Sequence, residues 1–158
     1  MKNIFVTVMA VLFCLSAAGW ADEVDQLLPE PVSNQLRTNT RAMIRSGVDS
    51  EDAIKMTRAM IQNRFQEREV LAAQRIVMEA RAQRLPEKAL INKAYEGMAK
   101  QVDAQAILAA MQQVQFRYAA SYQYARNLAK DQATVQRISN VSVDAMAAGL
   151  TTQSMERI

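Results

Sequence analysis

The sequence of 158 residues contains no histidine, and its only cysteine and only tryptophan, Cys14 and Trp20, lie within the first 21 residues. Residues 22–158 therefore contain no imidazole, thiol or indole. No serine or threonine can have a histidine as its base, and the side chains that most often bind transition metals are absent. No two glycines lie close together, which excludes a glycine-rich phosphate-binding loop. We predict a protein that is not an enzyme and has no catalytic residues, no metal site and no cofactor.

The first 21 residues have the pattern of a secretory signal peptide. Lys2 supplies the positive start, residues 4–15 the apolar run, and residues 16–21 the small-residue cleavage region. The apolar run is too short to span a bilayer as a helix, which needs about 20 residues. We predict cleavage after Ala21 and a periplasmic or secreted protein; cleavage after Ala18 and an uncleaved anchor are the alternatives. An exported chain without cysteine forms no disulfide, so packing alone must stabilise it.

The charges are nearly balanced. The chain has 19 Lys and Arg against 16 Asp and Glu, and loss of Lys2 with the signal peptide would reduce this excess of three by one. Nucleic-acid binding normally shows a pronounced basic excess or a basic stripe. We therefore predict that no nucleic acid is a partner.

The composition of residues 22–158 is typical of an all-α fold. Ala, Gln, Met, Arg and Glu are abundant and favour helices, and no segment alternates between apolar and polar residues. We predict a small helical bundle or short solenoid of five to seven helices, in a single domain over residues 33–158. Residues 22–32 are acidic and include Pro29 and Pro31, and we expect a flexible arm there.

Short corners between helices recur along the chain. Each consists of a helix-ending residue, one apolar residue, and a residue that caps or opens the next helix. The apolar residue can pack on the following turn. The four corners are Gly47-Val48-Asp49-Ser50, Arg84-Leu85-Pro86-Glu87, Gln101-Val102-Asp103-Ala104 and Gly149-Leu150-Thr151-Thr152.

A longer repeat underlies these corners. A shift of 37 residues places Leu71-Ala72-Ala73 on Leu108-Ala109-Ala110. Repeat units of about 34 to 47 residues are typical of helical solenoids. We predict two tandem α-hairpins, at about residues 48–84 and 85–121, with a further corner at Arg64-Phe65-Gln66. The flanking helices that would cap these hairpins are 33–46 and 134–148, with a final short helix from Thr152.

One helical segment carries the main candidate site. Asn92, Lys93, Glu96 and Lys100 fall at helical spacings and form one polar row, in which Glu96 and Lys100 have the favourable order for an ion pair. Gly97 lies inside this helix at a cost of about 1 kcal/mol relative to alanine, which is typical of close approach by a neighbour or ligand. The first hairpin lacks both features. We predict a binding site at Asn92, Lys93, Tyr95, Glu96, Gly97 and Lys100; the alternative is a solvated helix face with a tightly packed glycine.

The same segment has the pattern Leu-Pro-x-x-x-Leu-x-Asn-Lys-x-x-Glu-Gly-x-x-Lys-x-Val from Leu85, followed by Ile107. It resembles a segment of exported bacterial helical proteins for which no activity is known. The resemblance covers less than a fifth of the chain that follows the signal peptide. It implies an exported location and a helical fold, but no chemistry.

A second candidate site is a row of three arginines, Arg37, Arg41 and Arg45, at intervals of four residues. Like charges at this spacing repel each other slightly, so each arginine is expected to have a partner elsewhere. In one interpretation the partner is internal, with the acidic residues among 49–52 folding back on Arg45. In the other, the row is a surface for anionic partners such as phospholipid or lipopolysaccharide phosphates, or an acidic protein patch.

Four aromatic residues gather within nine positions: Phe116, Tyr118, Tyr122 and Tyr124. They predict either helix–helix packing or an exposed aromatic patch for a partner, because tyrosine is enriched at interfaces. The methionines are scattered, and we expect them to fill the core.

These features together predict a non-catalytic exported adaptor that engages another protein of the bacterial envelope through a helical face. There are two alternatives. One is a periplasmic chaperone or stress protein, since Leu150-Thr151-Thr152-Gln153 resembles the Leu-Thr-x-x-Gln motif of Spy-like periplasmic chaperones, one residue short. The other is a protein that contacts anionic lipid of the envelope through the arginine row.

Overall fold

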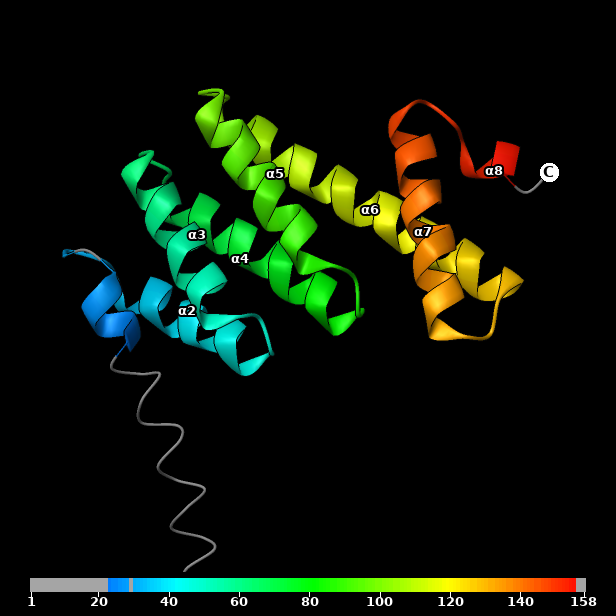
Figure 1. The fold of residues 1–158 in the computed structure, drawn as a ribbon. Coiled ribbons are helices and arrows are strands. Elements are labelled where there is room, and N and C mark those ends of the chain that lie inside the picture. The colour runs from blue at the N-terminus through cyan, green and yellow to red at the C-terminus, as the bar shows by residue number, and fades with distance from the viewer. Residues whose placement is uncertain (1–22, 29, 156–158) are drawn as a thin grey trace, which may run out of the picture. The chain divides into compact units, whose positions relative to one another are not determined.

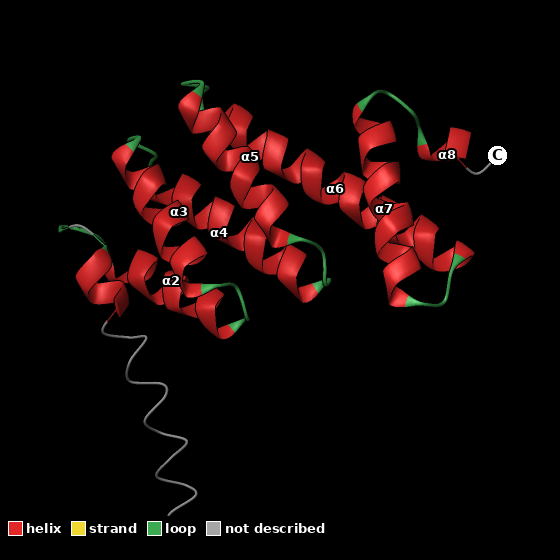
Figure 2. Ribbon diagram, in the orientation of Figure 1, coloured by secondary structure: helices red, strands yellow, loops and turns green. Residues whose placement is uncertain are grey.

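The fold is known from a computed structural model that describes residues 23–28 and 30–155 (Figure 1). Over these residues the chain consists of helices and loops without a strand (Figure 2), which confirms the all-α class and the helix number. The predicted signal peptide lies outside the described residues. A helical turn at 23–27 precedes seven helices: α2 (Asn34–Arg45), α3 (Ser50–Gln62), α4 (Glu67–Ala82), α5 (Glu87–Ala99), α6 (Ala104–Leu128), α7 (Gln132–Ala147) and α8 (Thr152–Met155).

Five of the helices, α2 to α5 and α7, end at the predicted corners, whereas α6 ends at Leu128, where no corner was predicted. At each corner one residue has a left-handed backbone, and the next residue donates its N–H to the carbonyl five positions earlier, a motif that closes the last helical turn. Asp49 and Asp103 then cap α3 and α6 by accepting backbone N–H groups of the first turn. The left-handed residues are Gly47 (φ 94°), Arg64 (φ 61°), Arg84 (φ 58°), Gln101 (φ 55°) and Gly149 (φ 105°).

The left-handed residues of the first four corners recur at the 37-residue interval of the predicted repeat. Gly47 and Arg84 are 37 positions apart, and so are Arg64 and Gln101. Three of these four residues, Arg64, Arg84 and Gln101, have long polar side chains, although their backbone conformation usually favours glycine. The 37-residue repeat of the hairpins themselves stays a prediction.

The chain divides into two compact units within α4, one ending at Gln74 and the other beginning at Arg75. In the first unit, α2 packs on α3 around the fully buried Met43, Met56 and Met60. Methionine is unbranched and flexible, which suits it to fill such a core. This placement agrees with the core role expected for methionine.

A buried polar cluster lies in the same unit. Gln74 donates from Nε2 to the hydroxyl oxygens of Thr40 (3.0 Å) and Thr57 (2.9 Å), and these hydroxyls donate to backbone carbonyls of their own helices. The amide thus links α4 to both α2 and α3. Its oxygen, Oε1, is buried and has no hydrogen-bond partner among the described residues.

The second unit is built around the 25-residue helix α6, which continues past residue 121, where the second hairpin was predicted to end. As Figure 1 shows, α5 lies along the first half of α6 and α7 crosses its second half. Between residues 23 and 155, the described helices include none that is both long and apolar enough to cross a membrane.

Candidate functional site

The charged side chains of the predicted polar row on α5 pair with one another. Glu96 accepts hydrogen bonds from Lys93 (2.5 Å) and Lys100 (2.6 Å), one through each carboxylate oxygen. The hydrogen bond from Lys100, followed by that from Lys93, lowers the pKa of Glu96 from 4.5 to about 2. Asn92, the first residue of the row, is exposed, and Tyr95 is half-buried. Each oxygen of this exposed carboxylate is therefore engaged by a lysine of the same helix.

Gly97 faces the neighbouring helix. A Cβ atom at this position would lie 2.4 Å from Cγ1 and 2.8 Å from Cδ1 of Ile107 on α6. Ile107 is buried, so α5 and α6 can approach this closely only because residue 97 has no side chain. The close neighbour expected from the sequence is thus found within the fold, as in the interpretation of a tightly packed glycine.

The arginine row is largely paired by the segment that we expected to be a loose arm. The Arg37 side chain is only 8% exposed and binds the carboxylates of Asp25 (3.3 Å) and Glu30 (2.5 Å). Arg41 pairs with the same Asp25 at 2.6 Å. Val24 and Leu28 of this segment are buried, while Arg45 is exposed at the end of α2.

The pairing of the arginines is internal, but its carboxylates come from the residues before α2 rather than from the predicted residues 49–52. Two of the three guanidinium groups are already neutralised. This weakens the row as a surface for phosphate groups, which need unpaired donors.

The tyrosines of α6 serve mainly to pack α7. Tyr122 is buried and donates a hydrogen bond to Gln136 of α7, and Arg126 lies 5.7 Å from the centre of its ring. Tyr118 is partly buried, and this burial, with the nearby Asp144, raises its pKa above 10.0. Phe116 differs, since 68% of its side chain is exposed.

An apolar groove runs between the end of α6 and α7, and we call it the α6–α7 groove. Ile138, Val141 and Ala145 line it from α7. Tyr124 and Leu128 line it from α6, and Leu150 and a few polar residues complete the lining of a hollow of about 540 Å³. All of these residues belong to the second unit.

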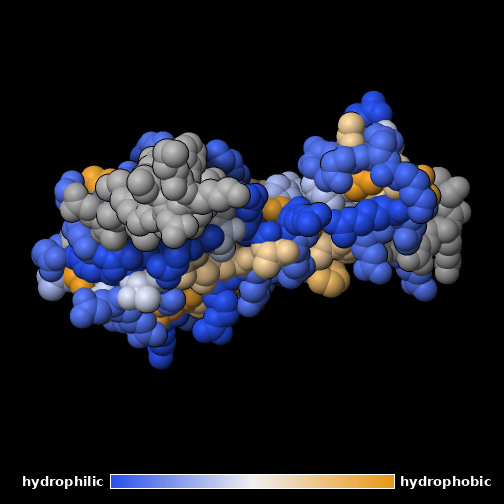
Figure 3. Space-filling model, turned by 90° about the horizontal axis from the view of Figure 1, so that it is seen from below, coloured by the Kyte–Doolittle hydropathy of each residue, from blue (hydrophilic) through white to orange (hydrophobic). Residues whose placement is uncertain are grey.

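The rim of this groove concentrates the exposed apolar surface. Leu128 is 60% exposed, Val141 71% and Leu150 40%. These are three of the six large apolar side chains that are exposed among the described residues. On the face drawn in Figure 3, hydrophilic residues predominate and hydrophobic areas are small and separate. Single exposed apolar residues are ordinary on a protein surface, but a convergent group marks an interaction site.

The groove is missing from the sequence-based predictions for a clear reason. The sequence predicts that residues 134–148 form a helix, but α7 has two stripes of small or apolar residues at helical spacing. One includes Val135 and the small Ser139 and Ser142, which are buried. The other, Ile138–Val141–Ala145, has the same helical spacing and lines the groove. The pattern alone does not tell which stripe is covered, although the presence of two was a usable signal.

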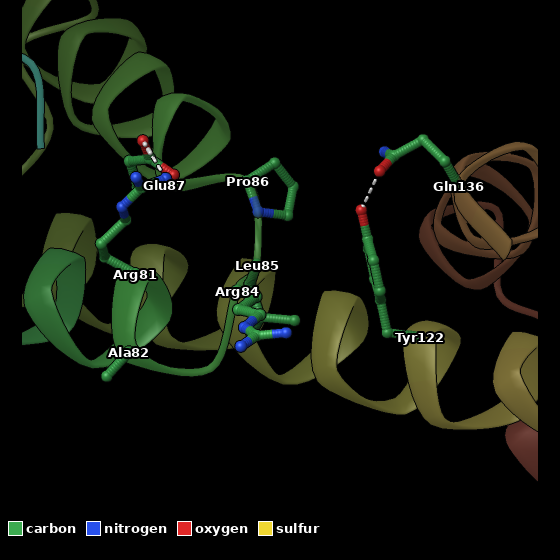
Figure 4. A pocket seen from close by; sticks show the side chains of 8 residues that line it. All are labelled: Arg81, Ala82, Arg84, Leu85, Pro86, Glu87, Tyr122 and Gln136. Atoms are coloured by element: carbon green, nitrogen blue, oxygen red, sulfur yellow. Dashed lines mark hydrogen bonds and ion pairs between the residues drawn. The ribbon is translucent and has the colours of Figure 1, made fainter. Parts of the chain in front are cut away.

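A second hollow, of about 590 Å³, is lined mainly by polar residues, and some of these already have partners within the hollow (Figure 4). Arg81 pairs with Glu87 across it at 3.6 Å, and on its other side Tyr122 donates to Gln136. Pro86 and Arg84 lie between these two pairs in the view of Figure 4. Because its carboxylate is already paired with Arg81 and its tyrosine with Gln136, this hollow is a weaker candidate than the α6–α7 groove.

Across residues 23–28 and 30–155, no three acidic, cysteine or histidine side chains lie close enough to hold a metal ion. Comparison with protein-family models, with characterised proteins and with solved structures found no match to the chain.

Proposed function

We propose that this protein is a non-catalytic exported adaptor and that it binds a segment of a partner protein in the α6–α7 groove. The observation that carries the proposal is the convergence of Leu128, Val141 and Leu150 on one apolar groove. Full burial of a valine or leucine side chain stabilises an assembly by about 1.5–3 kcal/mol. A partner that covers these three side chains together gains the free energy of burying all three at one site.

The dimensions of the groove suit a short helix. Its lining on α7 runs from Thr134 to Ala145. At 1.5 Å per residue this stretch is roughly 16 Å long, or about three helical turns. Partner helices that dock in grooves use apolar residues at spacings of three and four over such a length. We therefore propose that the bound segment is helical.

The groove takes the place of the α5 face as the preferred binding surface. The charges of Lys93, Glu96 and Lys100 are engaged with one another, so a partner there would have to disrupt existing ion pairs. In the groove, by contrast, the apolar side chains lose only contact with water when a partner arrives.

Export remains part of the proposal and rests on the sequence. The positive start, the short apolar run and the small residues up to Ala21 support it. Mass spectrometry of the protein purified from its own cells tests it. An N-terminus at Asp22, or at Gly19 for the alternative cleavage site, supports export, and an intact Met1 in a cytoplasmic fraction contradicts it.

Site-specific photo-crosslinking in the living cell tests the binding site. A benzoylphenylalanine at position 141 should give one dominant protein adduct, and the same probe at position 116 should not. Phe116 is the matched control because it is as exposed as Val141 but does not line the groove. The change Leu128→Glu should remove the adduct without unfolding the protein, since Leu128 is mostly exposed.

The pattern of adducts separates the proposal from its rivals. Many weak adducts, equal at positions 116 and 141, would indicate a chaperone that holds unfolded clients. A dominant adduct from a probe at Tyr95, with none from position 141, would place the partner on α5 and contradict the groove.

A further inference from the structure

We infer that the segment bound in the α6–α7 groove is an amphipathic helix of another protein with carboxylates beside its apolar face. This inference rests on the proposed function and adds the chemical class of the partner. The observation behind it is the charge of the groove and of the helices that form it.

The groove itself carries one charged residue, and that residue is positive. Arg137 is the only charged side chain in the lining, which contains no carboxylate. Its Nη2 donates to the hydroxyl of Thr134 at 3.1 Å. Within the described part of the chain it forms no ion pair, although, after the hydrogen bonds from Thr134, its charge contributes to lowering the pKa of Asp131. Most of its five N–H donors remain available to a ligand.

The helices that form the groove also carry a net positive charge. Between residues 104 and 155 the chain has four basic residues (Arg117, Arg126, Lys130 and Arg137) but only two acidic ones, Asp131 and Asp144. Asp131 is the N-cap of α7, where it accepts the backbone N–H of Thr134 at 2.8 Å. Neither carboxylate lines the groove.

The two properties together define the partner. An apolar segment with basic flanks would bring like charges to Arg137, and such an arrangement is unfavourable. A carboxylate one turn away from an apolar anchor can instead accept two N–H groups of the guanidinium in a bidentate pair. Apolar contact then supplies the affinity, and the carboxylate determines the orientation of the bound helix and selects for negative charge.

Two synthetic helical peptides of the same length and apolar stripe test the inference. One carries Glu on both flanks of the stripe and the other carries Lys. Binding of each labelled peptide to the full exported chain is measured by fluorescence anisotropy at low and high salt. We expect the Glu peptide to bind about tenfold more tightly at low salt, and this difference to shrink as salt screens the charges.

Three variants identify the side chains responsible. Arg137→Gln should weaken binding of the Glu peptide by about three- to tenfold, and it should strengthen binding of the Lys peptide because it removes a like charge. Arg45→Gln, which removes an exposed cation of the other unit, should change neither. Val141→Glu should abolish binding of the Glu peptide, because it places a charge in the apolar lining. Circular dichroism verifies that each variant is folded.

The outcomes separate this inference from the proposed function. If both peptides bind equally and Val141→Glu removes both, the groove binds helices without regard to charge, and the inference on carboxylates is overturned while the proposed function stands. If neither peptide binds, both are overturned. If sedimentation shows a dimer that Val141→Glu dissociates, a second copy of this chain is the occupant, and the inference fails.

Discussion

The contact between Gly97 and Ile107 makes a quantitative prediction about stability. Replacing Gly97 by alanine should improve the helix propensity of α5 by about 1 kcal/mol. The new Cβ atom, however, would lie 2.4 Å from Cγ1 of Ile107, at least 1 Å inside an ordinary contact distance. The two effects oppose each other, so the sign of the change reports how tightly α5 and α6 are packed.

The steric effect should win. Overpacking a well-packed core costs about 1–3 kcal/mol. Ile107 is only 1% exposed, so it cannot swing into solvent, and the closest atom is near its backbone rather than at its flexible end. The cost should therefore lie near the upper end of that range. After the gain in propensity, Gly97→Ala should destabilise the fold by about 1–2 kcal/mol.

A double-mutant cycle followed by urea unfolding and circular dichroism measures this effect. In an Ile107→Ala background the two clashing atoms are absent, and the remaining Cβ lies 3.4 Å away. Gly97→Ala should then be neutral or stabilising by up to about 1 kcal/mol, which corresponds to a coupling of about 1–3 kcal/mol. Ile107→Val removes only Cδ1 and should give a smaller coupling. The reasoning is refuted if Gly97→Ala raises the urea midpoint of the otherwise unchanged protein.

Three further predictions concern charged and polar groups. An NMR titration should show that Glu96 has a pKa of about 2, and that this pKa rises toward 4.5 when both of its lysine partners become Gln. Because folding lowers this pKa, the contribution of Glu96 to stability is complete above pH 4.5 and is lost as the pH falls toward 2. A titration midpoint near 4.5 in the unchanged protein would contradict the ion pairs. Arg37→Ala should lower stability by about 1–3 kcal/mol in chemical unfolding, since it leaves Glu30 without its arginine partner and Asp25 with Arg41 alone. The exposed Arg45→Ala should change stability by less than about 0.5 kcal/mol, and equal effects of the two changes would argue against docking of the first segment. Gln74→Met should lower the free energy of unfolding by less than about 1.5 kcal/mol, because it also removes a buried oxygen that has no hydrogen-bond partner. Gln74→Ala should lower it by about 2–4 kcal/mol, because it leaves a cavity. A larger decrease for Gln74→Met than about 1.5 kcal/mol would show that the hydrogen bonds of the amide dominate.

Local features of the fold could be predicted because they depend on neighbouring residues. The corners at Gly47 and Gly149 follow from the backbone freedom of glycine, and the caps at Asp49 and Asp103 from a short carboxylate before a helical turn. The sequence also indicated that Glu96 pairs with Lys100, since both lie on one helix face.

Long-range features could not be predicted in the same way. The sequence implied that Gly97 allows a close approach and that Arg37 needs a partner, but identifying Ile107, Asp25 and Glu30 required the packing of distant segments. The α6–α7 groove was missed because the exposed stripe through Val141 has the same spacing as a buried one.

The most direct test of the groove is methyl-resolved NMR of the protein during titration with the Glu-flanked peptide. We expect the methyl signals of Leu128, Ile138, Val141 and Leu150 to shift together and to saturate at one peptide per chain. The methyl signal of Ala99, beside the ion-paired row on α5, should stay unchanged. Shifts confined to Ala99 and its neighbours on α5, with the signals of the groove unmoved, would contradict the account.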